Sequence, residues 1–306
     1  MLRRFLLYLS EAGWAKALVT HFWLAKLAAR RFVAGETLDD AIDATRTLNE
    51  KGLLVSLDFL GESVAKAADT EEVVATYTQL IQRISNENLK ASVSLKLTHM
   101  GLDISEDLCL TNLRTILTDA KKYNIPVTID MESSAYTDVT LRIYRVMYDS
   151  GFDNVGTVIQ SMMRRSSDDM RQLASEGARI RLCKGAYLEE PEIAFPDKAD
   201  VDAHFIQITQ DYLKAETPAM LEVATHDDAM IDATLKAATE INLPPERYEI
   251  QMLYGIRPAK QAELAAGGYT MRVYVPFGGS WYPYLMRRMA ERPANLFFIL
   301  KNLFRK

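Results

Sequence analysis

The chain has 306 residues, 48% of them hydrophobic, and a formal net charge of −5. This composition supports a large buried core, and it disfavours nucleic-acid binding, which needs a basic surface. The two cysteines, Cys109 and Cys183, form no disulfide or zinc pattern, so a reducing compartment and no metal site are expected. No apolar run approaches the roughly 20 residues that a membrane-spanning helix needs.

The first 35 residues are strongly basic. Six basic side chains stand against Glu11 alone, which gives +5, so residues 36–306 carry −10. Apolar residues recur in this region at helical spacing: Phe5, Leu6, Leu9, Trp14, Leu18, Phe22 and Trp23. Two interpretations stay open, an arm that lies on an anionic membrane surface and helices that pack on the main domain. We assign residues 1–50 to an N-terminal helical arm and residues 51–306 to the main domain.

From residue 51 onward, strand and helix patterns alternate. Eight short β-rich runs, several of them nearly continuous in apolar residues, lie at 53–59, 92–97, 126–131, 155–160, 178–183, 219–225, 248–253 and 270–275. Helical patterns lie between them, most clearly at 71–86, 105–123 and 227–241. Eight strand–helix pairs predict an α/β fold, a (β/α)8 TIM-like barrel. A doubly wound sheet is the alternative, but no glycine-rich phosphate-binding motif follows a strand.

Polar side chains mark the end of nearly every predicted strand, where barrel enzymes place their chemistry. They are Asp58, Glu62, Lys96, Asp130, Glu132, Gln160, Arg181, Lys184, Tyr187, His226, Gln251, Tyr254 and Tyr274. Singly, most have a structural explanation: Lys96 and Asp130 as an ion pair, or His226 as a hydrogen-bonded core residue. Arg181 is the hardest to explain in this way, because burying an unpaired guanidinium costs too much. Together these side chains predict an active site.

The last predicted helix, YPYLMRRMAERP at residues 282–293, carries two adjacent arginines. At about 100° per residue, one face holds Tyr284, Arg287, Arg288 and Glu291, and the other holds Leu285, Met286 and Met289. The polar face is either a solvated surface on which Glu291 pairs with the arginines, or a clamp for an anion. We expect this helix to follow the eighth strand and to cap the barrel mouth.

Five motifs together resemble the proline dehydrogenase family in its short, single-function bacterial form: SLDFLGE, VIQSMMRR, RLCKGAY, QMLYGIR and VYVPFGGSWYPYLMRRMAE. The resemblance runs from about residue 50 to about residue 295 and is most specific in the last third. It implies FAD held without a covalent bond and oxidation of L-proline to Δ1-pyrroline-5-carboxylate, the first step of proline degradation to glutamate. Hydride would pass from proline C5 to flavin N5, and the electrons would pass to a membrane quinone. It also implies a cytoplasmic protein, with peripheral contact at the inner face of the cytoplasmic membrane and product transfer to a pyrroline-5-carboxylate dehydrogenase left open.

The resemblance also assigns roles to residues. Arg287, Arg288 and Lys96 would clamp the substrate carboxylate, and Asp130 would brace Lys96. Glu62 would act as a gate that pairs with Arg287 when substrate is bound. Arg181 would lie near flavin N5, so that Arg181, Lys96 and Asp130 are the catalytic candidates. Leu182, Tyr187 and Tyr274 would surround the proline ring, and Tyr274 would favour proline over hydroxyproline. The expected cofactor contacts are Gln160, Arg181, Lys184, Gly185, Ala186, Thr225, His226 and Glu291.

Two other functions remain open from the residues alone. A Schiff-base aldolase would use Lys96 or Lys184 as its amine and would need no flavin. A non-catalytic barrel, docked by its basic arm to a membrane or a partner, would bind no cofactor and would lose nothing on mutation of Arg288.

Overall fold

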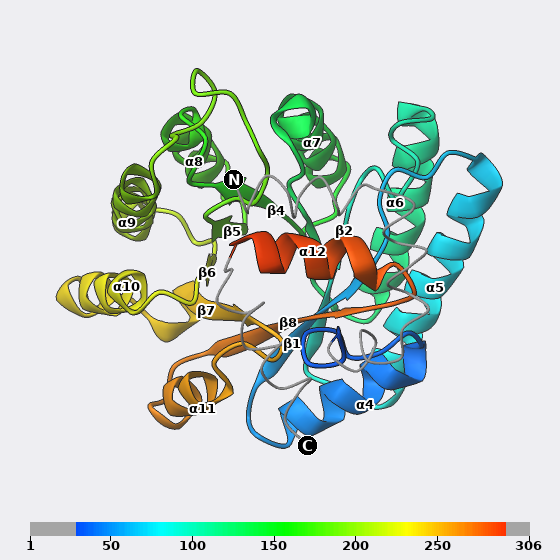
Figure 1. Cartoon of the computed structure of the whole chain (residues 1–306), viewed down its shortest axis with the longest axis horizontal. Helices are drawn as coiled ribbons and strands as arrows, with labels where there is room; N and C mark the ends of the chain where they lie inside the picture. Colours follow the sequence, from blue (N-terminus) through cyan, green and yellow to red (C-terminus); the bar gives the residue numbers. More distant parts are fainter. Residues whose placement is uncertain (1–28, 292–306) are drawn as a thin grey trace.

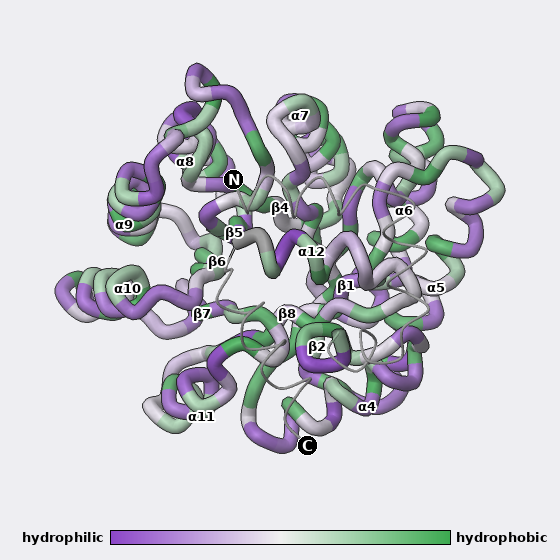
Figure 2. Tube along the Cα trace, viewed as in Figure 1, coloured by the Kyte–Doolittle hydropathy of each residue, from purple (hydrophilic) through white to green (hydrophobic). Residues whose placement is uncertain are grey.

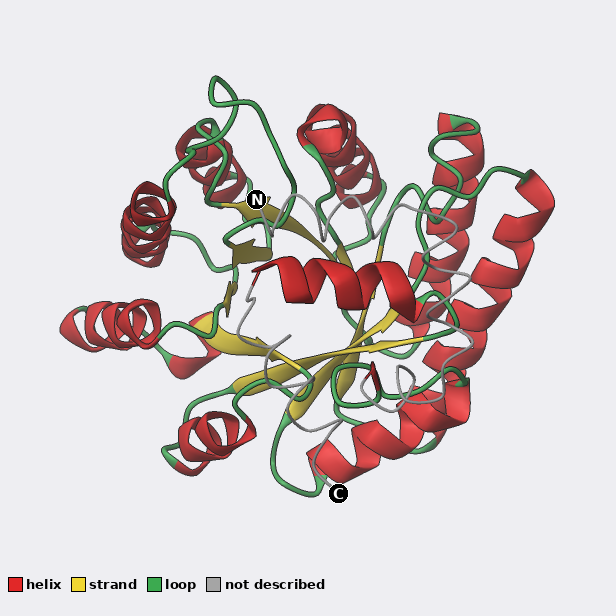
Figure 3. Cartoon of the chain, viewed as in Figure 1, coloured by secondary structure: helices red, strands yellow, loops and turns green. Residues whose placement is uncertain are grey.

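The computed structural model describes residues 29–291, and in this part of the chain eight parallel strands close into a barrel (Figure 3). Each strand pairs with the next one along the chain, and β8 pairs with β1, where Val55 lies opposite Val273. The predicted TIM-like barrel is therefore confirmed. The strands are β1 (Leu54–Phe59), β2 (Ala91–Leu95), β3 (Val127–Ile129), β4 (Val155–Gln160), β5 (Ile180–Cys183), β6 (Leu221–Ala224), β7 (Tyr248–Leu253) and β8 (Met271–Phe277).

A layer of helices surrounds the barrel (Figure 1). These helices are α4 (Leu38–Asn49), α5 (Ala67–Asn86), α6 (Glu106–Lys122), α7 (Ser134–Asp149), α8 (Ser166–Ser175), α9 (Lys198–Lys214), α10 (Asp228–Glu240) and α11 (Pro258–Ala266), with a short 3-10 helix at Pro245–Arg247. Among them, α5, α6 and α10 cover the three segments that the sequence predicts most clearly. In the described part of the chain, no helix is both long enough and apolar enough to cross a membrane.

Side-chain caps fix where several helices begin. Thr37 and Asp40 form a reciprocal capping box at the start of α4, and Ser105 Oγ accepts the Leu108 N–H at 3.2 Å at the start of α6. Asp227 accepts the Ala229 N–H at 3.2 Å at the start of α10. Such caps satisfy N–H groups that have no partner within the helix. The cap at Asp227 also holds the loop after β6, which carries Thr225 and His226.

The two faces of the strands differ in polarity. Val55 and Leu57 of β1 are fully buried in the main core between sheet and helices, and Figure 2 shows apolar and polar stretches alternating along the chain. Ser56 lies on the other face, where its hydroxyl bonds to Ser94 of β2 and to Arg181 of β5. Because β1 and β5 are not neighbours, the bond to Arg181 crosses the barrel interior. That interior is polar, so β1 alternates between an apolar face toward the helices and a polar face toward the barrel interior.

Helix α12 (Trp281–Glu291) lies across the barrel mouth (Figure 1), as the sequence predicts. Its buried side chains form a second apolar cluster with residues before α4 and after β1: Ala29, Phe32, Val33, Leu60, Trp281, Tyr282, Tyr284, Leu285, Met286 and Met289. Helix α4 packs against β1 and β8 instead, where a helix following β8 would otherwise lie. Of the predicted N-terminal arm, residues 1–28 lie outside the described residues.

Candidate active site

Three adjacent strand ends meet at one lysine. Lys96 follows β2, and its Nζ lies 3.2 Å from Asp58 Oδ2 and 3.5 Å from Asp130 Oδ2. Asp58 is in β1, and Asp130 directly follows β3. The Asp58 side chain is only 1% exposed, so the nearer carboxylate is the buried one. The predicted bracing of Lys96 by Asp130 is present, and Asp58 is a second partner that the sequence analysis did not assign.

Electrostatics keep this lysine charged. Burial by itself lowers the pKa of Lys96, but the Asp58 and Asp130 carboxylates outweigh burial and raise that pKa well above its ordinary value. Lys96 therefore acts as a cationic hydrogen-bond donor and is a poor amine nucleophile. The other aldolase candidate, Lys184, is also paired, with Nζ 2.7 Å from Asp202 Oδ1 and 3.4 Å from Asp227 Oδ2. Neither lysine supports a Schiff-base mechanism.

Asp130 joins Lys96 to two further predicted site residues. Its Oδ1 accepts a hydrogen bond from Arg181 Nη1 at 2.8 Å, and its Oδ2 accepts one from the Tyr274 hydroxyl at 2.6 Å. The Arg181 guanidinium also lies 5.3 Å from the centroid of the Tyr274 ring. Burial and then the Asp130 charge raise the pKa of Tyr274 well above its ordinary value, so the phenol keeps its proton. The three catalytic candidates Arg181, Lys96 and Asp130 thus lie in one network.

A bidentate ion pair connects α12 to the loop after β1. Arg287 Nη1 and Nη2 lie 3.0 Å and 2.5 Å from the two carboxylate oxygens of Glu62. Both side chains are largely buried, with 17% and 28% of their surface exposed. The Glu62–Arg287 pair is therefore formed in this structure, and its role as a gate stays a prediction. Glu62 also acts on Tyr187, whose pKa is raised first by burial and then by the Glu62 charge.

The neighbouring Arg288 stacks on an aromatic ring. Its guanidinium carbon lies 5.4 Å from the centroid of the Tyr284 ring, a distance typical of a cation–π contact. The helix projection placed Tyr284 on the polar face of α12, but the structure buries it to 6% exposure in the apolar cluster under that helix. A tyrosine suits both surroundings, because it has an apolar ring and a polar hydroxyl.

The predicted cofactor residues gather at the ends of β4, β5 and β6. Gln160 Nε2 donates to the carbonyls of Met131 and Glu132 at 3.0 and 2.9 Å, which fixes its side-chain amide. His226 Nε2 accepts the Leu253 N–H at 2.9 Å, so its ring proton is on Nδ1, the donor nitrogen. Thr225 Oγ1 accepts the Asp227 N–H at 3.1 Å.

The turn after β5 carries Lys184, Gly185 and Ala186. Gly185 has a φ of +102°, a conformation that strains residues with a side chain. A Cβ added there would lie 2.5 Å from Met162 Sδ. Glycine therefore allows this turn to pass close to the loop after β4, and it keeps the ends of β4 and β5 together.

Two predicted residues are placed differently. Leu182 is fully buried in the main core between sheet and helices, so in this structure it supports the site from behind and does not line it. The reason is the strand period of two, which directs Leu182 and Arg181 to opposite faces of β5. Glu291 belongs to α12, but its side chain lies outside the described part of the chain, so neither its predicted cofactor contact nor its predicted pairing with the arginines is observed.

Two buried titratable groups beside the network were not predicted as site residues. Glu132, 6% exposed, accepts the Thr98 hydroxyl at 2.7 Å, and burial raises its pKa from 4.5 to about 7. His99 is also 6% exposed, and burial and then the Lys96 charge lower its pKa to about 4. The sequence places Glu132 at a strand end. It does not show that the side chain is buried, which is what raises its pKa.

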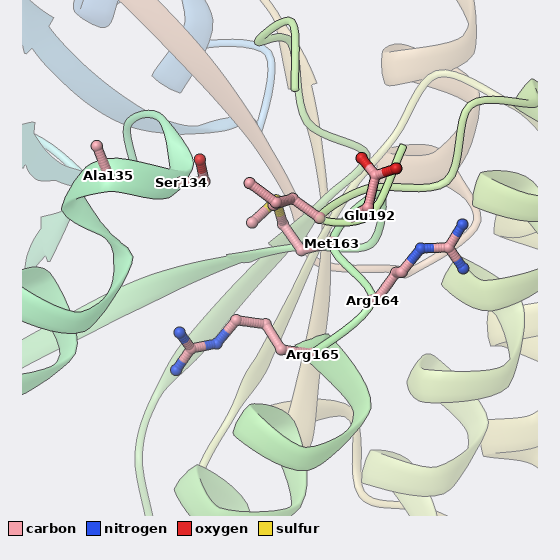
Figure 4. A pocket seen from close by; sticks show the side chains of 7 residues that line it. Ser134, Ala135, Met163, Arg164, Arg165 and Glu192 are labelled. Atoms are coloured by element: carbon pink, nitrogen blue, oxygen red, sulfur yellow. The ribbon is translucent and has the colours of Figure 1, made fainter. Parts of the chain in front are cut away.

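Figure 4 shows the lining of a cavity of about 460 Å³. It is lined by Ser134, Ala135, Met163, Arg164, Arg165, Glu192 and Ile193. Beside it, the Ser134 N–H donates to Glu189 at 2.8 Å, which ties the loop after β5 to the start of α7. Arg165 is held by Asp138 and Asp169. No predicted site residue lines this cavity.

A closed parallel barrel with charged side chains converging at the carboxyl ends of its strands is the architecture of a barrel enzyme. Residues 41–300 match the family model described as proline dehydrogenase. The chain is 44% identical to proline dehydrogenase 1 of Bacillus subtilis over 310 residues, covering 100% of both chains, and 40% identical to proline dehydrogenase of Deinococcus radiodurans, covering 90% of both. The chain therefore belongs to the proline dehydrogenase family, and it is an oxidoreductase that acts on a CH–NH group.

Solved structures agree on the fold. Proline utilization A from Bdellovibrio bacteriovorus, inactivated by N-propargylglycine, superposes with a TM-score of 0.80 at 23% identity, covering 90% of this chain and 33% of that one. The bifunctional PutA protein of Escherichia coli is 27% identical over 90% of this chain but only 24% of its own length. The relatives that align over their whole length are thus the short, single-function ones.

Proposed function

We propose that this proline dehydrogenase oxidises L-proline to Δ1-pyrroline-5-carboxylate with FAD as its cofactor and passes the electrons to a membrane quinone. When bound, FAD supplies the two-electron acceptor that takes hydride from C5 of proline. The observation that carries the proposal is the buried network of Lys96, Asp130, Arg181 and Tyr274 beneath the arginine pair of α12. Membership of the family supports proline as the substrate.

The substrate side of the site is formed by β1, β2, β3, β8 and α12. Arg287, Arg288 and Lys96 would hold the proline carboxylate, since charge-assisted hydrogen bonds to a carboxylate are short and directional. Tyr187 and Tyr274 would enclose the ring, with Leu182 behind them. Fixing the ring in this way supplies catalysis by orientation. Glu62 would pair with Arg287 when substrate is bound, and so act as a gate that holds the closed site together.

The residues at the ends of β4, β5 and β6 fit a flavin. They offer an amide held by two backbone carbonyls at Gln160, an Nδ1–H donor at His226 and a hydroxyl at Thr225. Lys184 adds a cation, and Gly185 and Ala186 place backbone without large side chains beside it. Arg181 lies between this group and the substrate side, and a cation there would stabilise negative charge on an acceptor. Glu291 is proposed as a further contact from α12.

Proton removal from the proline nitrogen is not assigned to a side chain by this network. Lys96 keeps its proton because the Asp58 and Asp130 charges outweigh burial and raise its pKa, and Tyr274 keeps its proton because burial and then the Asp130 charge raise its pKa. Lys96 would therefore act as a donor that orients the substrate, whereas the Tyr274 hydroxyl donates its proton to Asp130 and holds the ring in place. Solvent is proposed as the proton acceptor. Peripheral contact of residues 1–50 with the membrane that holds the quinone, and product transfer to a pyrroline-5-carboxylate dehydrogenase, belong to the same proposal.

The visible absorption spectrum of the purified protein, recorded before and after anaerobic addition of L-proline, tests the proposal. Flavin bands that bleach with proline are expected. A yellow protein that is indifferent to proline would overturn the substrate but keep the cofactor. A colourless protein that FAD cannot restore would overturn the flavin mechanism, and borohydride trapping at Lys96 would then test the aldolase alternative.

A further inference from the structure

A carboxylate in the middle of β6 is completely enclosed by charged and polar partners. Glu222 is 2% exposed. Its Oε1 accepts a hydrogen bond from Arg179 Nη1 at 2.6 Å, and its Oε2 accepts one from Gln251 Nε2 at 2.8 Å. The same Oε2 lies 3.2 Å from Arg181 Nε, an ion pair without hydrogen-bond geometry in this structure. Burying an ionised carboxylate at this depth is costly unless it is paired, so these contacts define where the side chain lies.

Arg181 connects Glu222 to the active site. Glu222 lies at the Nε edge of the guanidinium, while Nη1 donates to Asp130 at 2.8 Å and to Ser94 at 3.0 Å. Asp130 in turn accepts the Tyr274 hydroxyl at 2.6 Å. Because a guanidinium is planar and rigid, fixing one edge also fixes the direction of the other. An unbroken chain of contacts therefore runs from β6 through the barrel interior to the mouth.

We propose that Glu222 is a positioning residue for proline oxidation: it holds the Arg181 guanidinium in the plane that pairs with Asp130, and so sets the Tyr274 hydroxyl and Lys96 at the substrate pocket. Glu222 touches neither substrate nor cofactor. The inference rests on the roles proposed above for Arg181 and Asp130, and it goes beyond them by extending the machinery one strand deeper into the barrel.

Charge balance gives the inference a measurable consequence. The interior network pairs four cations with four carboxylates: Lys96, Arg179, Arg181 and Arg272 with Asp58, Asp130, Glu222 and Glu249. Burial alone would raise the pKa of Glu222, but the surrounding arginines outweigh burial and lower it, so Glu222 is ionised at neutral pH. Glu222→Gln keeps the size of the side chain, leaves the network with one excess positive charge and releases the Nε edge of Arg181.

The chain offers a matched control in the same interior. Glu249 of β7 is fully buried and binds Arg272 at 2.6 and 3.0 Å and Gln251 at 2.6 Å. Arg272 makes its other contacts to the Val55 carbonyl and to Ser92, and not to Asp130. Glu249→Gln therefore removes the same charge from the same interior without removing a direct partner of Arg181. Glu249 does share the Gln251 amide with Glu222, so the variant also controls for loss of that hydrogen bond.

The experiment compares the FAD-loaded wild type with the E222Q, E222D and E249Q variants. We expect E222Q to lower kcat for L-proline by about tenfold or more with KM changed by less than about threefold, because orientation is lost while the carboxylate clamp remains. E249Q should stay within about twofold of wild type in both constants. The midpoint potential of the bound flavin should rise more in E222Q than in E249Q, since the excess charge lies next to Arg181.

Equal effects of E222Q and E249Q on kcat and on the flavin potential would overturn the inference, since a general loss of charge would then explain both. If E222Q does not fold, the E222D variant provides the test, because it keeps the charge but withdraws the carboxylate from Arg181. A kcat between about two- and tenfold below wild type would support the role of Glu222. A kcat equal to that of wild type would overturn it. If the wild type does not oxidise proline, the proposed function itself is overturned. If the wild type is active and E222Q is equally active, only the role of Glu222 is overturned.

Discussion

At the scale of single residues, the site is defined by how each charge is partnered. Lys96 lies between two carboxylates, and Asp130 divides its two oxygens between Arg181 and Tyr274. Lys96 and Tyr274 keep their protons at neutral pH, because the pKa of each is raised well above its ordinary value. Glu132 differs, because burial brings its pKa to about 7. The charge of Glu132 therefore changes in the physiological range.

Glu132→Gln should change how stability depends on pH. The folded pKa of Glu132 is raised from 4.5 to about 7, so its stabilising contribution is complete below about pH 4.5 and is lost as pH rises through 7. This loss amounts to up to about 3 kcal/mol. Relative to wild type, the glutamine variant should become more stable by up to that amount between about pH 5 and about pH 8.

Urea denaturation at the two pH values measures this difference. Glu240→Gln, at the exposed end of α10, is the matched surface control and should show no such trend. If the difference in unfolding free energy between Glu132→Gln and wild type stays constant with pH, Glu132 is already ionised throughout this range.

Tyr274→Ser should alter the choice of substrate. The Tyr274 phenol donates to Asp130 and its ring lies against the Arg181 guanidinium, so we expect kcat/KM for L-proline to fall about tenfold. Hydroxyproline should be oxidised better than by wild type, because a ring hydroxyl no longer collides with the phenol. Steady-state kinetics with both substrates give the ratio. Tyr274→Phe keeps the ring and should retain the preference for proline, and an unchanged ratio in Tyr274→Ser would contradict the steric explanation.

At the scale of elements, α12 and the loop after β1 close the mouth together. The Glu62–Arg287 pair joins them, and Leu60 packs in the same apolar cluster as Trp281 and Met286. The buried His99 ring also packs closely against this loop at Gly61. A Cβ added at Gly61 would lie 2.1 Å from His99 Nε2, and the buried His99 ring itself packs on Phe59 at 5.5 Å between centroids. The position of Glu62 therefore depends on the absence of a side chain at its neighbour.

Gly61→Ala should lower the free energy of unfolding by about 1–3 kcal/mol, because a methyl group forced into a filled space displaces its neighbours. Moving this loop should also weaken the Glu62–Arg287 pair and raise KM for proline. Gly279→Ala is the control, because a Cβ at Gly279 meets nothing within 4 Å. Chemical denaturation of both variants gives the comparison, and equal stability of the two would show that the loop absorbs the methyl group without strain.

At the scale of the whole molecule, the barrel interior is an ion network built from nearly every strand. Arg272 of β8 binds Glu249 of β7 and reaches the Val55 carbonyl of β1, so it lies where the barrel closes. The Glu249 side chain is fully buried and the Arg272 side chain 13% exposed. Pairs of this kind cost desolvation on folding, but removing one partner leaves an uncompensated charge inside the protein.

Arg272→Met should therefore lower the free energy of unfolding by about 3–5 kcal/mol, since it leaves the buried Glu249 carboxylate without its cationic partner. The double variant Arg272→Met/Glu249→Gln should be more stable than Arg272→Met alone. A double-mutant cycle measured by chemical denaturation separates the pair from its parts. If the two single effects simply add, the residues are not coupled and the network description of the interior fails.

Much of this architecture could be predicted from the sequence. Eight strand patterns that alternate with helical patterns indicated the barrel. Polar residues at the strand ends indicated where chemistry would lie, because parallel strands bring their carboxyl ends to one edge. Motif resemblance then indicated the family and the arginine pair of α12. These signals are local in the chain, so each can be recognised without knowing what lies opposite in space.

Only the tertiary structure decided which charges meet. Asp58 and Lys96 are 38 positions apart, and Glu222, Arg181 and Asp130 come from β6, β5 and the end of β3. The burial of Tyr284 and Glu132, and the burial of Leu182 behind the site, likewise depend on neighbours that the chain brings in from elsewhere. The alternation of side chains along the chain determines which faces of the strands can be buried. Closure of the barrel then places charged side chains of different strands opposite each other across the interior. The distance between two such charges sets whether they pair and how far their pKa values shift.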